Sequence, residues 1–415
     1  MGRLQAPAAA LTDDAPRAFP WKLFGFAFFG WAFDFYDLVL FGFLKDDIAR
    51  DVGLSHAWEP WLLGVALATS GIGGLAAGAL SDRFGKRTVL AGTVLIYSVG
   101  SLTCGLATSV PMLLLGRGIV GLGVGGEWAV GHSMIAEAVA PRMRGRASAA
   151  LQAGEPLGVA LAALAGYLIA PRVGWRWVMI GSSATALLAV AMRASLHLPA
   201  EPSKHRVRFS ALRRSGLGKR MAAAWVLGVL KLGTYWTCYT WLPSFLLREM
   251  HQGVGRSIAW VLTAQVGQLI GMLTFGHVAD RVGRRPAFCA FSLVTAGALV
   301  PLAFRWQWLS AHPPWFWATM LTLGLGSGCT AGFGALLAEL FPTEVRGTAM
   351  GATYNLARAA QLFAPVAIAQ AFAWRGLEAA LSVPVALALA TASWVWVLPE
   401  TRGIPLPELA EAEPD

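Results

Sequence analysis

The sequence predicts an all-α membrane protein in which twelve transmembrane helices form two pseudo-symmetric six-helix bundles. Three observations predict this fold class: the composition, a series of long apolar runs, and a repeat that relates the two halves of the chain. Of the 415 residues, 56% are hydrophobic and only 13% are charged, whereas a soluble globular chain has about 25% charged residues. The mean hydropathy is +0.56. This balance excludes a soluble enzyme and indicates a chain whose surroundings are the lipid bilayer.

An apolar run of about 20 residues is long enough to cross about 30 Å of hydrocarbon as a helix. We expect spans at residues 21–44, 58–80, 88–107, 112–138, 147–170, 175–198, 221–246, 257–279, 286–304, 315–340, 348–372 and 379–398. The expected organisation is an N-terminal tail (1–20), a first bundle (21–198), a basic linker (199–220), a second bundle (221–398) and a C-terminal tail (399–415).

The distribution of Lys and Arg predicts the topology. An even number of spans places both termini on one side of the membrane, and cytoplasmic loops carry the excess of basic residues. The 33 basic residues concentrate in the N-terminus, the even-numbered loops and the C-terminus, so we expect both termini and the linker in the cytoplasm. Because these residues form short clusters and no single basic face, no nucleic-acid partner is expected.

The cysteines give no indication of a disulfide framework or a metal site. Cys104, Cys238, Cys289 and Cys329 each fall singly within an apolar run, without pairing or metal-ligand spacing. The sequence also shows no nucleophile motif. We therefore expect no metal, no cofactor and no enzymatic activity.

An internal repeat relates the two halves. The segment GALSDRFGKR (78–87) recurs as GHVADRVGRR (276–285), 198 residues later. The segment EAVAPRMRG (137–145) recurs as ELFPTEVRG (339–347), 202 residues later, and PAEP is echoed by the closing PETRG. Three matches in the same order at one spacing predict two six-helix halves in parallel repeat, which in membrane proteins favours alternating access to a site between the halves.

These segments resemble the motifs of the major facilitator superfamily. The resemblance is carried by the doubled loop GxLxDRxGRR, by the Arg-x3-Gly-x-Gly pattern at Arg117, Gly121 and Gly123, and by PETRG. Within that superfamily, the resemblance is to bacterial metabolite:proton symporters and sialate-type carboxylate transporters, whose fourth span is similar to GVGGEWAVGHSMIAEAVAPRMRG. Glu155 and Lys231 depart from the pattern of those relatives. The resemblance implies a carrier of the bacterial inner membrane that uses protons, and we expect a monomer.

Charged residues in the repeated loops predict a conformational latch on the cytoplasmic side. Asp82 ends the second span, where its carboxylate can face the N-terminus of a neighbouring helix while the cations that follow hold helix carboxyl ends. Plain anchoring of short turns is the alternative, but acidic residues contribute little to topology. The expected latch residues are Asp82, Arg83, Arg87, Asp280, Arg281, Arg285, Glu137, Arg144, Glu339 and Arg346.

Seven ionisable residues lie well inside the expected spans. A charge at mid-bilayer costs about 2.5 to 3.5 kcal/mol when it is unpaired. These residues must therefore be paired, hydrated or functional. They are Asp34, Asp37, Arg117, Glu127, Glu155, Lys231 and Arg358.

Asp34 and Asp37 lie three residues apart in FDFYDLVLFG and share one face of the first span. Two carboxyls so close favour retention of a proton by one of them, which is the property of a proton carrier. In sugar-porter-like members of the resembled superfamily, the carboxylate of an aromatic-Tyr-Asp sequence in this helix is linked to proton coupling, and Asp37 matches it. The same resemblance implies Arg117 as its partner. A purely structural ion pair between the first and fourth spans is the alternative.

Two further acidic residues lie in the first half. Glu127 is ten residues from Arg117, about 15 Å along a helix, which is too far for contact. We expect Glu127 either to support close helix packing or to face a cavity. Glu155 precedes Pro156, so the backbone is expected to bend there and the carboxyl to face water or a neighbouring span. Glu155 is the second candidate for protonation.

Cations in the second half predict an anion site. Arg358 stands in YNLARAAQ, where Tyr354, Asn355 and Gln361 share or flank its face of the eleventh span. A guanidinium presents a bidentate fork to a carboxylate, and the amides and the phenol can bind the remaining oxygens. Lys231 in the seventh span is followed by a series of aromatic residues beginning with Tyr235, spaced as one lining of a cavity.

The expected function is therefore symport of protons with a small organic anion, a monocarboxylate, by alternating access. The cations of the substrate site lie in the second half and the carboxylates lie in the first. Within transport, the alternatives are a neutral sugar or polyol, which leaves Arg358 and Lys231 to pair with internal acids, and drug efflux. Outside transport, the alternative is a membrane-embedded enzyme or a sensor.

Overall fold

The computed structural model describes residues 19–54, 58–140, 143–185, 187–188, 191, 195, 217–248, 254–342 and 345–404. Almost all of these residues form helices joined by short turns. The side chain of Asp82, most of the expected linker and most of both expected tails lie outside the described part of the chain.

The first half contains five complete spans and the start of a sixth. The fifth span is a composite of four segments, and its helix is interrupted at Ala153, three residues before Pro156. Because Pro156 has no N–H, it cannot donate to the carbonyl of Gln152 four residues earlier. The elements, with η marking 3-10 or π segments, are α1 (Trp21–Val52), α2 (Glu59–Phe84), α3 (Lys86–Gly105), α4 (Val110–Ala138), α5 (Arg144–Gln152), α6 (Gly154–Leu164), η2 (Ala165–Ile169), α7 (Ala170–Val173), α8 (Trp175–Ser182) and η3 (Ser183–Thr185).

The second half repeats this series. The eleventh and twelfth spans meet inside α18, where Arg375 and Gly376 have non-helical dihedrals and the φ of +70° at Gly376 suits glycine. The elements are α11 (Leu217–Arg248), α12 (Val254–Val282), α13 (Arg284–Phe304), α14 (Trp306–Ala311), α15 (Pro313–Ser327), η4 (Gly328–Ala331), α16 (Gly332–Leu340), α17 (Arg346–Ala359), η5 (Ala360–Phe363), α18 (Ala364–Trp394) and η6 (Val395–Val397).

The helices confirm the all-α membrane fold. Within the described residues, nine helical segments are long and apolar enough to cross a membrane. The other three expected spans correspond to α8 with η3, to α11, and to α17 with η5 and the start of α18. The last of these contains the buried Arg346 and Arg358, whose charges lower its hydropathy.

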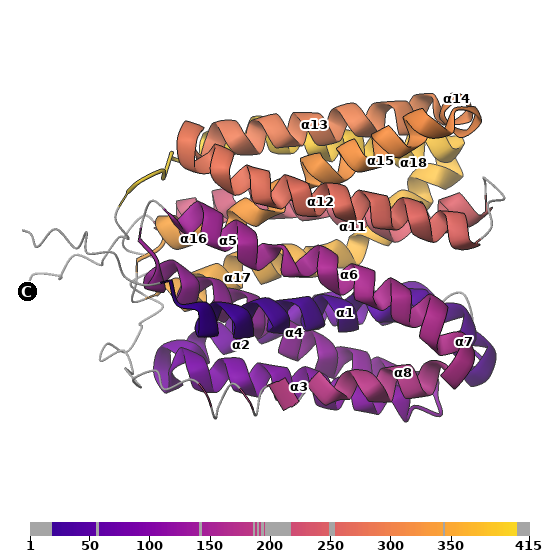
Figure 1. Ribbon diagram of the computed structural model, residues 1–415, viewed down its shortest axis with the longest axis horizontal. Coiled ribbons are helices and arrows are strands. Elements are labelled where there is room, and N and C mark those ends of the chain that lie inside the picture. The colour runs from indigo at the N-terminus through magenta and orange to yellow at the C-terminus, as the bar shows by residue number, and fades with distance from the viewer. Residues whose placement is uncertain are drawn as a thin grey trace, which may run out of the picture.

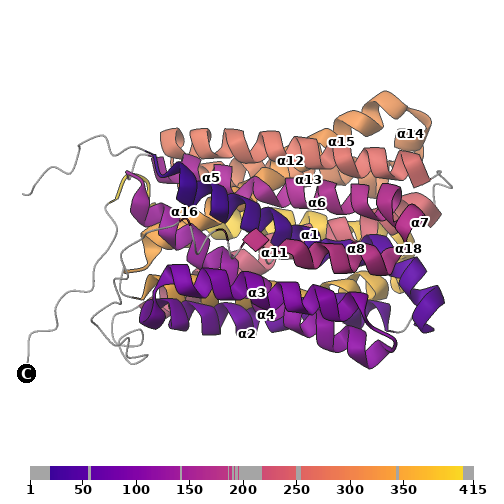
Figure 2. The same ribbon diagram turned by 60° about the horizontal axis from the view of Figure 1, so that its bottom comes forward.

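The two halves lie side by side with their helices along one common direction (Figure 1). α5 and α6 pack along α12, and α2 packs along α17, so these helices form the interface between the halves. Figure 2 shows α1 and α6 between α12, α13 and α15 of the second half and the group of α2, α3 and α4. The largest buried cluster includes Trp31, Trp128, Phe333 and Tyr354, and so crosses that interface.

The repeated loops lie at one end of the bundle. α1 begins at that same end (Figure 1), where the carbonyl of Ile404 accepts a hydrogen bond from Arg144 at the start of α5. Gly85 separates α2 from α3 with a φ of +85°, and Gly283 separates α12 from α13 with a φ of +110°. Only glycine adopts such values readily. The glycine of each DRxG segment is therefore required by the tight turn between two spans.

Candidate functional site

The ionisable residues expected inside the spans are buried in the centre of the molecule. Each of the seven side chains is at most 2% exposed. They come from α1, α4, α6, α11 and α17, so helices of both halves supply them. Several of their polar atoms have no hydrogen-bond partner among the described residues, which marks this region as the candidate site.

Arg358 lies in an aromatic enclosure. Its guanidinium carbon is 5.3 Å from the ring centroid of Trp31, 6.0 Å from that of Phe35 and 5.1 Å from that of Tyr354. Nη1 and Nη2 have no hydrogen-bond partner among the described residues. Aromatic faces attract a cation, but they leave its in-plane N–H groups free. The fork of Arg358 is thus available to an anion.

Glu155 links the two halves through neutral amides. Its Oε2 accepts from Gln152 Nε2 at 2.7 Å, and its Oε1 accepts from Gln268 Nε2 of α12 at 2.8 Å. Gln152 in turn accepts from the indole N–H of Trp128 at 3.0 Å. Arg358 is among the charges that face Glu155. The two residues, 203 positions apart, occupy corresponding places in the fifth and eleventh spans.

Three residues expected beside Arg358 have well-defined contacts. Tyr354 stacks on Trp128 with ring centroids 3.7 Å apart. Asn355 donates to the carbonyl of Gly125 at 2.7 Å, and only its Oδ1 lacks a partner among the described residues. Gln361 Nε2 donates to backbone carbonyls of the second half, at 2.8 and 3.2 Å. The amide nitrogens that were expected to bind a substrate are therefore already occupied in this conformation.

Lys231 and Tyr235 lie one turn apart on α11. Lys231 is 1% exposed, and its Nζ has no partner in the described part of the chain. The ring of Tyr235 meets that of Phe35 edge to face, with centroids 6.5 Å apart, and Tyr235 also faces Glu155. This helix therefore brings a cation and a phenol to the interface between the halves.

Arg117, the partner that the resemblance implies for Asp37, contacts the backbone of α1 and not the Asp37 carboxylate. Nη1 donates to the carbonyl of Asp37 at 3.1 Å, Nη2 to that of Leu38 at 2.9 Å, and Nε to that of Leu62 at 3.3 Å. The Asp37 carboxylate accepts from the hydroxyl of Ser101 at 2.8 Å. Arg117 is thus a bridge between α4, α1 and α2 whose charge lies near Asp37, without direct contact of the two side chains.

Asp34 and Asp37 turn toward different neighbours, although they share one face of α1 as their spacing predicts. The 100° step of an α-helix separates residues three apart by about 60° around the axis, enough to send them into different surroundings. Asp37 faces Ser101 of α3, whereas Asp34 faces Glu127 of α4 and Arg358 of α17. The close carboxyl partner of Asp34 therefore comes from another helix.

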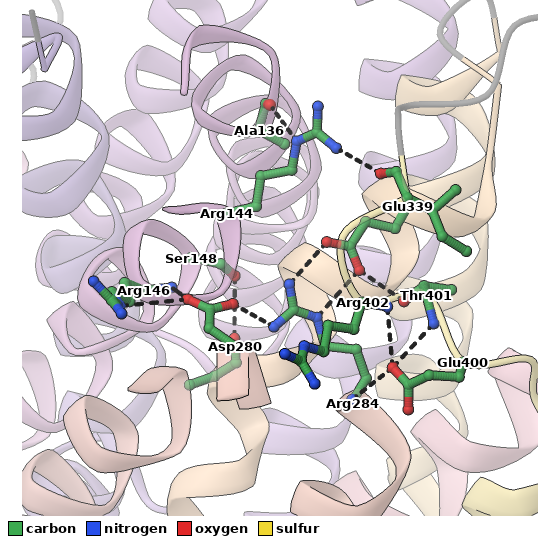
Figure 3. Close-up of polar contacts among 12 residues, drawn as sticks. Ala136, Arg144, Arg146, Ser148, Asp280, Arg284, Glu339, Glu400, Thr401 and Arg402 are labelled. Atoms are coloured by element: carbon green, nitrogen blue, oxygen red, sulfur yellow. Dashed lines mark hydrogen bonds and ion pairs between the residues drawn. The ribbon is translucent and has the colours of Figure 1, made fainter. Parts of the chain in front are cut away.

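A second set of charges joins the halves (Figure 3), at the end of the bundle where α1 begins (Figure 1). Asp280 of α12 accepts from the backbone N–H of Arg146 at 3.2 Å, in the first turn of α5, and lies 3.6 Å from the Nε of the same residue. Its other oxygen is 2.5 Å from Nη1 of Arg284. The carboxylate thus meets the N-terminus of a helix from the opposite half, as its position in the repeat predicts.

Glu339 and Glu400 complete this network in the second half (Figure 3). Arg284 binds both oxygens of Glu339 with its fork, at 2.8 and 3.1 Å, and Thr401 donates its hydroxyl to the same carboxylate at 2.7 Å. Glu400 accepts from the backbone N–H groups of Arg284 and Arg285 at 2.7 and 3.1 Å. Burial alone raises the pKa of the Glu400 carboxyl, but these donors and two further N–H groups lower it below its ordinary value.

The acids and arginines of the second repeated motif bind partners outside their own motif. Glu137 bonds Lys86 at 2.5 Å and Arg346 of the opposite half at 2.8 Å, whereas Arg144 donates to the carbonyls of Ala136 and Ile404. The Nε of Arg346 likewise donates to the carbonyl of Ala338, eight residues earlier. Each arginine thus binds the end of the helix before it, which directs its fork across the interface.

The remaining expected latch residues differ in their contacts. Arg83 and Arg281 are exposed, and Arg83 lies over the ring of its neighbour Phe84. Arg285 lies over the ring of Trp396 and donates to its carbonyl. Arg87 is half-buried. Among these, the contacts described for Arg83 and Arg285 are all within one half of the chain.

Glycines let the repeated loops approach the opposite half. A Cβ added at Gly78 would lie 2.6 Å from the carbonyl oxygen of Gly347, and one added at Gly276 would lie 3.0 Å from that of Gly145. Both separations are shorter than ordinary contacts. Gly78 therefore packs on Gly347, and Gly276 packs on Gly145. In both cases the first glycine of a loop motif meets the glycine that follows Arg346 or Arg144 in the opposite half.

Sequence reasoning missed several residues of the site. Trp31, Trp128, Gln152 and Gln268 contribute contacts to Arg358 or Glu155, yet none of them was expected at the site, although Trp128 lies within the quoted segment of the fourth span. Polar residues within apolar spans were the available signal for the two glutamines. Lys86 and Arg284 occupy corresponding places in the repeated loops and belong to the cations that were expected to follow each aspartate.

Known proteins resemble this chain over nearly its whole length. Residues 23–264 and 252–414 match the family model of the Major Facilitator Superfamily. The chain is 33% identical over 418 residues to a probable 4-methylmuconolactone transporter of Cupriavidus pinatubonensis, with 94% of this chain and 93% of that protein covered. It is 31% identical over 367 residues to a cis,cis-muconate transport protein of Acinetobacter baylyi, with 84% and 87% covered. The fold is similar to that of the proton:xylose symporter XylE bound to 6-bromo-6-deoxy-D-glucose, with a TM-score of 0.77, 19% identity, and 94% and 98% covered.

Proposed function

The chain belongs to the major facilitator superfamily, and from this premise we propose that it is a proton-coupled symporter of a small organic anion, with a monocarboxylate as the expected substrate. It is a multi-pass membrane transporter and not an enzyme. Of the two relatives described above, one is named for the transport of cis,cis-muconate, the anion of an organic acid, and the other for the transport of 4-methylmuconolactone. That chemistry supports an anionic substrate for this chain.

Arg358 is the observation that carries the proposal. A buried guanidinium whose two terminal nitrogens have no partner among the described residues is an expensive feature in a membrane. A substrate carboxylate removes this cost, because it forms two charge-assisted hydrogen bonds with the fork. A neutral sugar offers no countercharge, and this argues against the sugar or polyol alternative. Drug efflux has no comparable support from a particular residue.

The aromatic rings around Arg358 define the rest of the proposed substrate site. Trp31 and Phe35 come from α1, and Tyr354 comes from α17, so both halves contribute. A planar, apolar substrate body suits such walls. Tyr235 and the unpartnered Oδ1 of Asn355 can orient polar groups of the substrate, whereas Gln361 supports the helix packing beside it.

The coupling protons are proposed to bind buried carboxyls of the first half. Asp37, Asp34 and Glu155 are the candidates, and Arg117 provides positive charge near Asp37. Glu155 accepts hydrogen bonds from neutral amides of both halves, and Tyr235 of the second half also contacts it. Protonation of Glu155 therefore changes a contact between the halves, which suits a carboxyl that influences alternation.

The charged network at the loop end is proposed to hold the halves together there. Asp280 with Arg146 and Glu137 with Arg346 each join one half to the other. We propose that this end is cytoplasmic, that the protein lies as a monomer in a bacterial inner membrane, and that both termini lie in the cytoplasm. The concentration of basic residues in these loops supports that orientation.

A dicarboxylate is the second candidate substrate. Lys231 is a second buried cation without a partner in the described part of the chain. A substrate with two carboxylates supplies a countercharge for each cation. Under this alternative, the affinity for a dicarboxylate depends on both Lys231 and Arg358.

Uptake into proteoliposomes tests the proposed function. Labelled benzoate and benzamide form a matched acid and amide pair, and labelled cis,cis-muconate represents dicarboxylates. An outside-acid pH gradient should drive accumulation of at least one of the acids, and an ionophore that collapses the gradient should abolish it. Arg358→Ala should remove this uptake. Equal uptake of acid and amide, or uptake of acids that ignores the gradient, would contradict the proposal.

A further inference from the structure

Two buried carboxyls from different helices of the first half face each other in the membrane core. Glu127 of α4 reaches the backbone of α1 at Gly30, where an added Cβ would stand 1.7 Å from its Oε1. Its carboxyl lies within hydrogen-bond reach of the Asp34 carboxyl, one helical turn beyond Gly30. Asp34 is 0% exposed and Glu127 is 2% exposed. Glycine at position 30 is what allows this close approach.

The two carboxyls lack donors when both are ionised. Both oxygens of Asp34 and the Oε2 of Glu127 have no hydrogen-bond donor among the described residues. A carboxylate only accepts hydrogen bonds, whereas a protonated carboxyl also donates one. A single proton between Asp34 and Glu127 therefore turns two facing acceptors into a bonded pair. It also removes the repulsion between two like charges in a medium of low polarity.

The other buried carboxyls of the core do have donors. Glu155 accepts from the amides of Gln152 and Gln268, one at each oxygen. Asp37 accepts from the hydroxyl of Ser101. Hydrogen bonds of this kind stabilise the ionised form. Among the four carboxyls, Asp34 and Glu127 are thus the two for which a bound proton supplies the hydrogen-bond donor that the described residues do not.

The charges of the core also require a proton. Among the described residues, four buried carboxyls lie there with three cations, Arg117, Lys231 and Arg358. An uncompensated charge is strongly disfavoured at this depth. At least one carboxyl must therefore be protonated for the core to be neutral.

Arg358 is the cation that faces the pair from the second half. The positive charge of Arg358 acts on the carboxyl of Asp34. Its guanidinium lies over the rings of Trp31 and Phe35, which flank Asp34 on α1. Its two terminal nitrogens have no partner in the described part of the chain. The other ionisable groups that face the pair are Asp37 on the same helix and Tyr97 on α3.

Resting on the proposed function, we propose that Asp34 and Glu127 share one exchangeable proton and that Arg358 couples this proton to the substrate anion. An anion bound to Arg358 neutralises the positive charge that opposes protonation of the pair. The pair then holds its proton more firmly. By thermodynamic reciprocity, the protonated pair favours binding of the anion to the same extent. Proton and anion are thereby bound together and released together.

Infrared difference spectroscopy of the full-length protein in lipid, without substrate, tests the shared proton. A protonated buried carboxyl gives a C=O stretching band that disappears when the group ionises. At neutral pH, wild type should show this band. Asp34→Asn and Glu127→Gln should each abolish it, because either change leaves one ionised carboxylate and no partner for a shared proton. Asp37→Asn is the matched control and should keep the band.

The same spectra test the role of Arg358. Arg358→Gln should move the midpoint of the band's disappearance upward by about 1 to 3 pH units, because a nearby cation is lost. Loss of the band in only one of the two pair variants, its loss in Asp37→Asn, or an unchanged midpoint in Arg358→Gln would overturn the proposal. Thermal unfolding of each variant identifies any that fails to fold, and the double variant Asp34→Asn/Glu127→Gln then provides a second test, with no band expected.

The experiments distinguish failure of the shared-proton proposal from failure of the proposed symport. If gradient-driven uptake of acids is present but the spectra show no shared proton, only the inference about the pair is wrong. If the spectra behave as expected but no acid is taken up under a pH gradient, the proposed symport is wrong and the shared proton has no coupling role.

Discussion

Gly78→Ala should open the loop end of the protein. The new Cβ would lie 2.6 Å from the carbonyl oxygen of Gly347 and 3.0 Å from both its carbonyl carbon and the Cα of Thr348. These are backbone atoms of the opposite half, so no side-chain rotation relieves the contact. Overpacking of this kind costs about 1 to 3 kcal/mol. Because the cost arises only while the halves touch, the closed population should fall by about 5- to 150-fold relative to the open one.

Pulsed electron paramagnetic resonance between spin labels measures this change. The labels are placed at Thr88 of α3 and Val282 of α12, because both residues are exposed and they belong to different halves. The half-buried Cys289 should first be replaced, since the other cysteines are buried. Gly78→Ala should add a population at longer distance.

Gly92→Ala provides the control for this experiment. An added Cβ at Gly92 meets no atom within 4 Å, yet the change brings the same gain in helix propensity. The control should therefore match wild type. Identical distance distributions for Gly78→Ala and Gly92→Ala would show that the glycine contact does not limit opening.

Three further predictions concern single side chains. Arg358→Lys should weaken binding of a transported acid by about 1.5 to 3 kcal/mol, because the charge remains but the planar fork is lost, and isothermal titration with the acid and its amide shows whether the loss is specific to the carboxylate. Asp280→Asn should leave that affinity near wild type while the spin labels described above report a more open loop end, and collapse of binding without a change in distances would refute a conformational role. Glu400→Gln should lower the thermal stability at neutral pH and have no effect in acid. The pKa of Glu400 is lowered by folding, so its stabilisation is present above its ordinary pKa of 4.5 and is lost as the pH falls through the lowered value. A constant difference between the two proteins at all pH values would contradict that prediction.

The sequence predicted the architecture because its signals are local and repeated. Apolar runs of fixed length mark spans, and two copies of the loop motif mark the repeat. The same locality explains the position of Gly85 and Gly283, which the turn geometry requires. The buried Arg358 was also predictable, since a charge in an apolar span calls for a function.

The partners of the buried acids were not predictable in this way. Spacing along one helix suggested that Asp34 pairs with Asp37, but helix packing places Glu127 beside Asp34. Similarly, Glu137 and Arg346 were both expected in the latch, but the repeat did not indicate that they bind each other across the interface. Contacts of this kind depend on how helices rotate and pack against one another, which no short segment of sequence encodes.

Substrate-driven proton entry is the most direct test of the central claim that an organic anion and a proton move together through the site of Arg358. Proteoliposomes that contain a trapped pH indicator and begin at equal pH on both sides should acidify internally when benzoate or cis,cis-muconate is added outside. Control liposomes without protein establish the passive entry of each acid. The account predicts faster acidification with wild type than with Arg358→Gln or with empty liposomes, and none with benzamide. Uptake of a labelled acid by the wild-type protein without any such acidification would contradict it.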